Sequence, residues 1–438
     1  MRHIATLLIS WALCLFFIPT SAQIYHFTTK KIIKGQPGDI IWTEGIHNNH
    51  KAKFGTLIAK ENSNTKSSKL IGIPIIYTYP DNNNNNTPIF ILNGGPGESN
   101  LTNNMFFENL ASIYPIVMIG YRGVDGSTQL HCPCIQNAIN NPKLSLETSK
   151  TIFSNAADSC KNYLKKQLID IHGYTTDEVI NDIEAVRKNL NLKKINIVSF
   201  SFGTMLAQLY ATSHPSQIDK NILIAPRRLF DFSIHCDDIA RLDKQINTML
   251  NPTSPFIIRQ MIDNYTNIKH NINQSLYMLF IYSKLYSVND INELANMLTA
   301  CKNNNHQPLI ENYQRFCDIF ATKIVLGDVI TKTTSFIITD TYRRENTPYL
   351  PISTTANHWF NASPGFSKYQ TQQQQNSSNT LIICGDSDVV SSVEMIKSEF
   401  AKSYVTLKIA TIKEAGHIDL LSTKRDIVEN YIIHHLKN

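Results

Sequence analysis

The sequence lacks several features that would assign a chain to a common binding class. Basic residues outnumber acidic ones by 41 to 35, but they are scattered and form no block beyond short pairs such as Lys193-Lys194, which argues against a nucleic-acid partner. No Gly-x-Gly-x-x-Gly follows the early apolar runs, and no glycine turn leads into Gly-Lys-Ser or Gly-Lys-Thr. Cys132-Pro133-Cys134 has no close second pair of ligands. We therefore expect no nucleotide loop, no metal site and no cofactor.

The N-terminus resembles a secretory signal. Arg2 precedes an apolar run from Ile4 to Ile18, and small residues lie just before Gln23. A single membrane anchor is the alternative, but the run is short for a span and lacks a charged stop behind it. We predict a signal peptide over residues 1–22, export to the periplasm or the exterior, and no stable membrane association after cleavage.

Seven cysteines remain after that cleavage, an odd number for a chain that meets an oxidising compartment. Their spacing does not fix the disulfide connectivity. Proximity in sequence suggests Cys132 or Cys134 paired with Cys160, and Cys301 paired with Cys317. Cys384 lies in an apolar run and is expected to be a buried free thiol.

Short apolar runs alternate with amphipathic helical stretches in two separated regions, the pattern of a mostly parallel sheet covered by helices. The predicted strands are Ile40 to Trp42, Phe54 to Ala59, Leu70 to Tyr77, Pro88 to Leu92, Ile113 to Ile119, Ile195 to Phe200, Ile218 to Ile224, Thr380 to Cys384 and Tyr404 to Ile412. Thr175 and Glu178 form a capping-box pair that predicts a helix from Thr175 to Asn189.

The pattern becomes helical between these two regions, from about residue 231 to residue 349, with helices expected at Asp237 to Leu250, Pro255 to Tyr265, Gln274 to Tyr286 and Leu309 to Leu326. We predict a helical lid (cap) inserted into one catalytic domain, which comprises residues 23–230 and 350–438. A separate second domain is the alternative.

The strongest local motif is Ser199-Phe200-Ser201-Phe202-Gly203, which joins a predicted strand to an apolar-periodic helix. A nucleophile elbow needs a strained turn that raises a serine hydroxyl above the sheet, with small residues two positions before and after it. Gly203 meets this need, and Ser199 replaces the usual first glycine by another small residue. The motif predicts Ser201 as a nucleophile.

A second motif, Asn-Gly-Gly-Pro-Gly at residues 93–97, follows another predicted strand. Consecutive glycines allow positive φ and expose backbone N–H groups that can stabilise an oxyanion. We predict an oxyanion hole formed by the N–H groups of Gly94, Gly95 and Phe202. An ordinary glycine turn is the alternative.

Two further segments follow the last two predicted strands. A serine hydroxyl needs a histidine to accept its proton and a carboxylate to orient that histidine. His417 and Asp388 fit these roles, because the chain order Ser, Asp, His is the one found on this kind of sheet. Asp386 competes with Asp388, but an acid normally lies a few residues beyond its strand.

Together these motifs resemble the prolyl aminopeptidase and tripeptidyl aminopeptidase group of α/β-hydrolase serine peptidases. The resemblance is carried by residues 93–97, by Tyr121 to Ser127 with Leu130 and Cys132-Pro133, by Tyr174 to Thr176, by residues 199–211, and by the Asp388 and His417 segments. It implies an α/β-hydrolase fold and an exported enzyme that removes N-terminal residues, proline among them, or short N-terminal peptides. Arg122 is expected to brace the loop near the oxyanion turn.

An aminopeptidase must also recognise a free α-ammonium group, which buried carboxylates can do by charge-assisted hydrogen bonds. Glu311, Asp340 and Glu345 are candidates, and Glu345 is preferred because it lies where the lid should rejoin the catalytic domain. The expected partners are therefore peptides with a free N-terminus. An exported esterase or other acyl hydrolase with the same triad is the alternative function. Epoxide hydrolases and dehalogenases would place an aspartate at the elbow.

Overall fold

In the computed structural model of the chain, nine strands of the described residues form one sheet in the order β1-β2-β3-β5-β4-β6-β7-β8-β9. The structure describes residues 35–81, 85–95, 98–130, 134, 137, 146–226, 277, 280, 281, 283–322 and 376–438. The strands are β1 (Ile40–His47), β2 (His50–Lys60), β3 (Leu70–Thr78), β4 (Ile89–Leu92), β5 (Ile116–Ile119), β6 (Ile195–Phe200), β7 (Ile218–Ile224), β8 (Asn376–Gly385) and β9 (Tyr404–Ile412). All nine predicted strands are confirmed, three of them with the predicted bounds.

The sheet begins antiparallel and continues parallel. Strands β1, β2, β3 and β5 pair antiparallel, whereas every later neighbour pair is parallel. Asn48 and Asn49 form the two-residue turn between β1 and β2, with φ values of 46° and 66°. Asparagine tolerates this left-handed backbone, which two-residue hairpins require at both positions.

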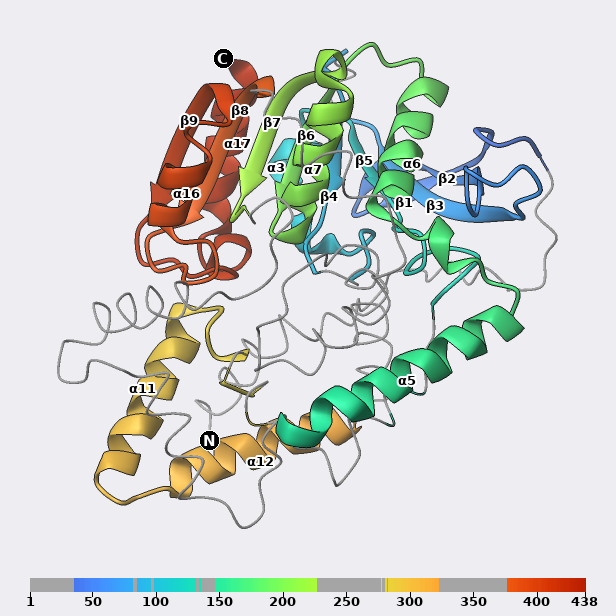
Figure 1. Cartoon of the computed structure of the whole chain (residues 1–438). Coiled ribbons are helices and arrows are strands. Elements are labelled where there is room, and N and C mark those ends of the chain that lie inside the picture. Colours follow the sequence, from blue (N-terminus) through green and yellow to red (C-terminus); the bar gives the residue numbers. More distant parts are fainter. Residues whose placement is uncertain are drawn as a thin grey trace.

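The helices are α3 (Glu108–Ala111), α5 (Leu146–Lys166), α6 (Thr176–Asn189), α7 (Phe202–Ser213), α11 (Val288–Lys302), α12 (Gln307–Thr322), α16 (Val393–Glu399) and α17 (Arg425–Lys437). Short 3-10 turns lie at η1 (Asn103–Met105), η2 (Ile171–Gly173), η3 (Pro215–Gln217) and η4 (Asp419–Leu421). Helices cover both faces of the sheet (Figure 1).

Alternating residues of the central strands fill two separate apolar cores, one on each face. Phe90 and Leu92 of β4 join the core formed with α6, α7 and α16, whereas Ile89 and Ile91 join the core formed with α3 and α17. Successive side chains of a strand point to opposite faces, so strands buried on both sides need continuous apolar runs. This explains why β4 and β5 are unbroken apolar segments in the sequence.

Helix α6 begins where the capping pair predicts. The Thr175 hydroxyl accepts a hydrogen bond from the N–H of Glu178 at 3.3 Å. The Glu178 carboxylate does not return to the cap, and instead accepts hydrogen bonds from the N–H and the hydroxyl of Ser63. Only half of the capping box forms, because a tertiary partner competes for the glutamate.

Helices α11 and α12 belong to the block predicted to form the lid. Figure 1 shows both helices, together with α5, beyond the end of the sheet to which the arrow of β7 points. The predicted helix from Leu309 to Leu326 corresponds to α12, whereas those at 237–250 and 255–265 lie outside the described residues. The lid as a whole therefore stays a prediction, as does the signal peptide over residues 1–22. No helix among the described residues is long and apolar enough to cross a membrane.

The cysteines correct one expectation. Cys301 is a buried free thiol, so the predicted pair with Cys317 is wrong. Cys160 is disulfide-bonded and Cys134 is free, which excludes Cys134 as its partner. Cys384 is free and fully buried in the sheet, as predicted.

Candidate active site

The turn from β6 into α7 places Ser201 in a strained backbone conformation. Ser201 has φ 49° and ψ −117°, and its N–H donates to the carbonyl of Ile224 on β7 at 3.0 Å. A Cβ on Gly203 would lie only 2.0 Å from the carbonyl oxygen of Leu92, so this position requires glycine. Ser199 is fully buried in the sheet, where its hydroxyl donates to the carbonyl of Ile222 at 3.0 Å. A serine therefore fits where a glycine was expected.

Three side chains from the ends of different strands form one hydrogen-bonded chain. His417 Nε2 lies 2.8 Å from Ser201 Oγ, and His417 Nδ1 lies 2.9 Å from Asp388 Oδ2. Ser201, His417 and Asp388 are 9, 2 and 0% exposed. The structure thus brings together the three residues that the sequence predicts as nucleophile, base and acid.

The carboxylate of Asp388 is held on both of its oxygens. While Oδ2 faces His417, Oδ1 accepts hydrogen bonds from the N–H groups of Val390 and Ser391 at 2.8 and 2.7 Å. Asp386 is exposed and accepts a hydrogen bond from the neighbouring hydroxyl of Ser387. The geometry selects Asp388 over Asp386 as the partner of His417.

The predicted oxyanion turn lies directly against the elbow. A Cβ on Gly94 would lie 3.0 Å from Ser201 Cβ, so this glycine allows the close approach. The N–H of Gly94 donates to the side-chain oxygen of Asn93 at 2.8 Å. Gly95 is exposed, with φ 141°, and Phe202 begins α7. Pro96 and Gly97 lie outside the described residues.

Buried polar side chains fix the glycine turn in place. Asn100 Oδ1 accepts from the N–H of Asn93 at 2.6 Å, and its amide donates to the carbonyls of Ile91 and Ile119. The Tyr121 hydroxyl donates to the carbonyl of Asn93 at 3.0 Å. Sequence reasoning missed Asn100, because an asparagine in a polar loop gives no signal of where its amide points.

Asp125 links this arrangement to the next loop. Its carboxylate accepts from the hydroxyl of Ser99 and from the N–H groups of Asn100 and Tyr121 at 2.6, 3.2 and 2.9 Å. Charge-assisted hydrogen bonds of this kind are stronger than neutral ones. They fix the loop after β5 against the glycine turn.

Arg122 lies buried behind the same loop and does not contact the triad. Its guanidinium donates to both oxygens of Asp182 at 2.7 and 2.6 Å, and to the carbonyls of Glu61 and Gly173. Burial would lower the pKa of Arg122, but the carboxylates of Asp182 and Glu178 raise it above its ordinary value. Burial raises the pKa of Asp182, and Arg122 opposes that shift. These contacts fit the predicted bracing role.

Aromatic rings flank His417. The ring of Phe200 lies 5.1 Å from the imidazole, and the ring of Tyr286 meets it edge-on at 5.6 Å. Tyr286 is 37% exposed and belongs to the helical block. Sequence reasoning missed it, because nothing in a helical pattern indicates which residue reaches a distant histidine.

Of the three predicted amine-binding carboxylates, only Glu311 lies within the described residues. Glu311 is an exposed residue of α12 whose carboxylate accepts from the amide of Gln307 at 3.0 Å. Asp340 and Glu345 lie outside the described residues. Within the described part of the chain, no group of three or more His, Cys, Asp or Glu side chains could hold a metal ion.

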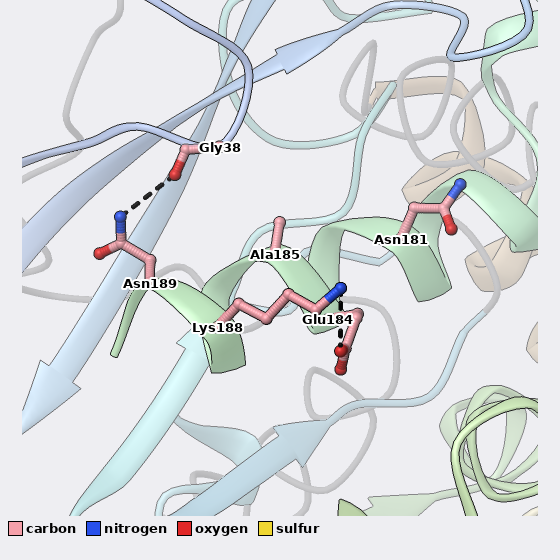
Figure 2. A pocket seen from close by; sticks show the side chains of 6 residues that line it. All are labelled: Gly38, Asn181, Glu184, Ala185, Lys188 and Asn189. Atoms are coloured by element: carbon pink, nitrogen blue, oxygen red, sulfur yellow. Dashed lines mark hydrogen bonds and ion pairs between the residues drawn. The ribbon is translucent and has the colours of Figure 1, made fainter. Parts of the chain in front are cut away.

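A surface hollow lies elsewhere, on α6. It is lined by Gly38, Asn181, Glu184, Ala185, Lys188 and Asn189 (Figure 2). Asn189 donates to the carbonyl of Gly38, and Lys188 pairs with Glu184 at 3.4 Å. Four of its six lining residues thus pair with one another, and none of the triad residues lines it.

Comparison with known proteins gives a family model described as the alpha/beta hydrolase fold, which matches residues 87–246. The putative hydrolase YuaR of Escherichia coli is 28% identical over 155 residues, 34% of this chain and 29% of that protein. The tripeptidyl aminopeptidase of Streptomyces coelicolor is 25% identical over 145 residues, 30% of this chain and 26% of that protein. A putative proline iminopeptidase of Mycoplasma genitalium is 23% identical over 150 residues, 34% of this chain and 36% of that protein.

These matches span about a third of the length of the curated relatives. Among solved structures, a thermophilic esterase from Thermogutta terrifontis is 12% identical with a TM-score of 0.42, over 87% of this chain and 99% of that chain.

Proposed function

We propose that this chain, which has the α/β-hydrolase fold, is an exported serine aminopeptidase acting on peptides with a free N-terminus. The observation that carries the proposal is the continuous hydrogen-bonded chain from Ser201 through His417 to Asp388 at a nucleophile elbow. All three residues are buried, so their hydrogen bonds are little weakened by solvent.

The geometry supports acyl transfer. Ser201 Oγ attacks the scissile carbonyl while His417 Nε2 accepts its proton, and Asp388 holds the imidazole in the tautomer that makes this transfer work. His417 then gives the proton to the leaving amine, and an ester to Ser201 remains. Water then attacks that ester while His417 accepts a proton from it. His417 returns the proton to Ser201 Oγ as the acid product leaves.

The negative charge that develops on the carbonyl oxygen needs hydrogen-bond donors already in place. The N–H of Gly94 already donates to the side chain of Asn93. The proposal therefore assigns this role to the N–H groups of Gly95 and Phe202. The polar network beneath the turn, from Asn100 to Asp125, fixes these donors before the substrate arrives.

The choice of an aminopeptidase rests on the motifs and on two relatives named as a proline iminopeptidase and a tripeptidyl aminopeptidase. Glu345 is the proposed partner of the substrate ammonium. Export rests on the N-terminal segment alone. An esterase or other acyl hydrolase is the second candidate. The aromatic rings of Phe200 and Tyr286 beside His417 would suit the apolar part of an ester as well as that of a peptide.

A substrate panel separates the two candidates. Purified protein is offered chromogenic amides with free and with blocked N-termini, alongside short-chain esters, and Ser201→Ala is the control. Hydrolysis confined to free-amine amides supports the aminopeptidase. Equal or faster cleavage of blocked amides or esters contradicts it, and any activity that survives Ser201→Ala removes Ser201 as the nucleophile.

A further inference from the structure

The side chain of Asp419 connects two segments: the turn that contains His417, and the first residue of α11. Its Oδ2 accepts one hydrogen bond from the N–H of Gly416 at 2.8 Å and a second from the N–H of Val288 at 2.9 Å. The side chain is 6% exposed. One buried carboxylate oxygen therefore bridges two segments that lie 131 residues apart.

A second set of contacts reinforces this bridge. The N–H of Ile418 donates to the carbonyl of Tyr286 at 3.0 Å. A Cβ on Gly416 would lie 3.0 Å from both Ser287 Cα and the carbonyl oxygen of Tyr286, so the two backbones touch here. The residues on both sides of His417 are thus held through segment 286–288, whose Tyr286 ring also contacts the imidazole.

Segment 286–288 is itself firmly built. The Ser287 hydroxyl caps α11 by accepting from the N–H of Asp290, and it donates to the Asp290 carboxylate. Lys284 is buried and pairs with Asp290 and Glu293. Helix α11 therefore presents its first N–H group to Asp419 from a fixed position.

We propose that Asp419 is a positioning residue: it docks α11 onto the His417 turn, and this docking sets the imidazole in its reactive orientation. The proposal rests on the proposed function, since it concerns the base of the same triad. Catalytic side chains must be held within about 0.5 Å of their productive geometry, and supporting hydrogen bonds provide that control. The helical block then contributes to the chemical step as well as to substrate access.

Val288→Pro tests this docking at a position where helix α11 itself tolerates proline. Val288 is the first residue of α11, where proline is favoured, and Ser287 before it has the extended backbone (φ −132°, ψ 156°) that a following proline requires. The substitution removes the N–H that donates to Asp419 and puts the proline Cδ in its place, which displaces the carboxylate from α11. Val288→Ala is the matched control, because it shortens the same side chain and keeps that N–H.

The readout is the rate at which a small fluorophosphonate labels Ser201, which depends on His417 but needs no peptide-binding contact. We expect Val288→Pro to be labelled about threefold to tenfold more slowly than Val288→Ala. Asp419→Ala should lose about tenfold or more, since a misplacement of about 1 Å can cost about 100-fold. Asp419→Asn, which keeps an acceptor oxygen, should recover most of the rate.

Each result has a separate meaning. If wild type is not labelled at Ser201, the proposed function fails whatever the variants do. If wild type is labelled and Val288→Pro equals Val288→Ala, the docking inference is overturned. Rates are measured below the melting temperature of each variant, and a purely structural role would lower that temperature while leaving the labelling rate of folded protein unchanged.

Discussion

Replacing Arg122 by methionine tests the buried charge network behind the active-site loops. Methionine keeps most of the side-chain length and removes the guanidinium. The arginine and aspartate side chains are 1 and 5% exposed, so Asp182 would stay buried without its partner. The carbonyls of Glu61 and Gly173 would also lose their donor.

The burial of both side chains determines how much stability Arg122→Met should lose. Removing one member of a buried ion pair costs about 3 to 5 kcal/mol, because the other charge stays uncompensated. We expect Arg122→Met to lower the free energy of unfolding by that amount at pH 7. The double variant Arg122→Met with Asp182→Leu removes the bidentate pair but leaves the buried Glu178 carboxylate, which lies 3.5 Å from Arg122 and also accepts hydrogen bonds from Ser63. We expect it to cost less than Arg122→Met alone, although two carbonyls still lose their donor at roughly 1 kcal/mol each.

The loss of stability in Arg122→Met should become smaller as the pH falls. Burial already raises the pKa of Asp182, and without the opposing Arg122 that pKa rises further. A carboxyl group whose pKa is higher in the folded state favours folding below its unfolded value of about 3.8, and this contribution is lost as pH rises through the folded value. The gap between wild type and Arg122→Met should therefore narrow from pH 7 towards pH 4.

Urea unfolding at pH 7 and pH 5, followed by tryptophan fluorescence, measures these quantities for wild type, both single variants and the double variant. The reasoning is refuted if Arg122→Met costs less than about 1 kcal/mol, well below the range expected for a buried pair. It is also refuted if the double variant is as unstable as the single one, or if the gap widens at acid pH.

Three further changes test other features. Gly203→Ala should destabilise the chain by about 1 to 3 kcal/mol and abolish labelling of Ser201, because its Cβ meets the Leu92 carbonyl, and an unchanged melting temperature would contradict this. Burial raises the pKa of the Cys384 thiol to about 11, so alkylation of this residue at pH 8, followed by peptide mapping, should be slow until the chain unfolds. Despite burial, hydrogen bonds from neighbouring side chains lower the pKa of Glu184 to about 2. The stabilising contribution of this carboxylate is fully present above pH 4.5 and is lost as the pH falls towards 2. A plot of the free energy of unfolding against pH should therefore be less steep between these pH values for Glu184→Gln than for wild type.

The strands could be predicted because their physical cause is local. Strands buried on both faces need apolar residues at successive positions, as in β4 and β5, whose four residues are all apolar and buried. The predicted bounds of β6, β7 and β9 agree with the structure. The elbow was readable for a similar reason: only small residues fit where α7 approaches the carbonyl of Leu92. Ser201, Asp388 and His417 could be proposed together because each follows such a strand.

Contacts that join distant segments left no trace in the sequence. Glu178 looked like the second half of a capping box, yet its carboxylate bonds Ser63, 115 residues away. Asn100 lies in a polar loop, yet its amide donates to the carbonyls of Ile91 and Ile119 on two strands. Cys301 lies near Cys317 in sequence, yet it is a free thiol. Local spacing in the sequence carries no information about which distant groups a side chain meets in the fold.

The bridge at Asp419 limits how this scaffold could be re-engineered. The triad follows β6, β8 and β9, so the connection between β7 and β8 could be exchanged without replacing a triad residue. A transplanted connection would still have to return a backbone N–H to Asp419 and a carbonyl to Ile418. Any grafted connection must therefore place its backbone correctly against the His417 turn. This requirement concerns the backbone of the graft and does not restrict its sequence.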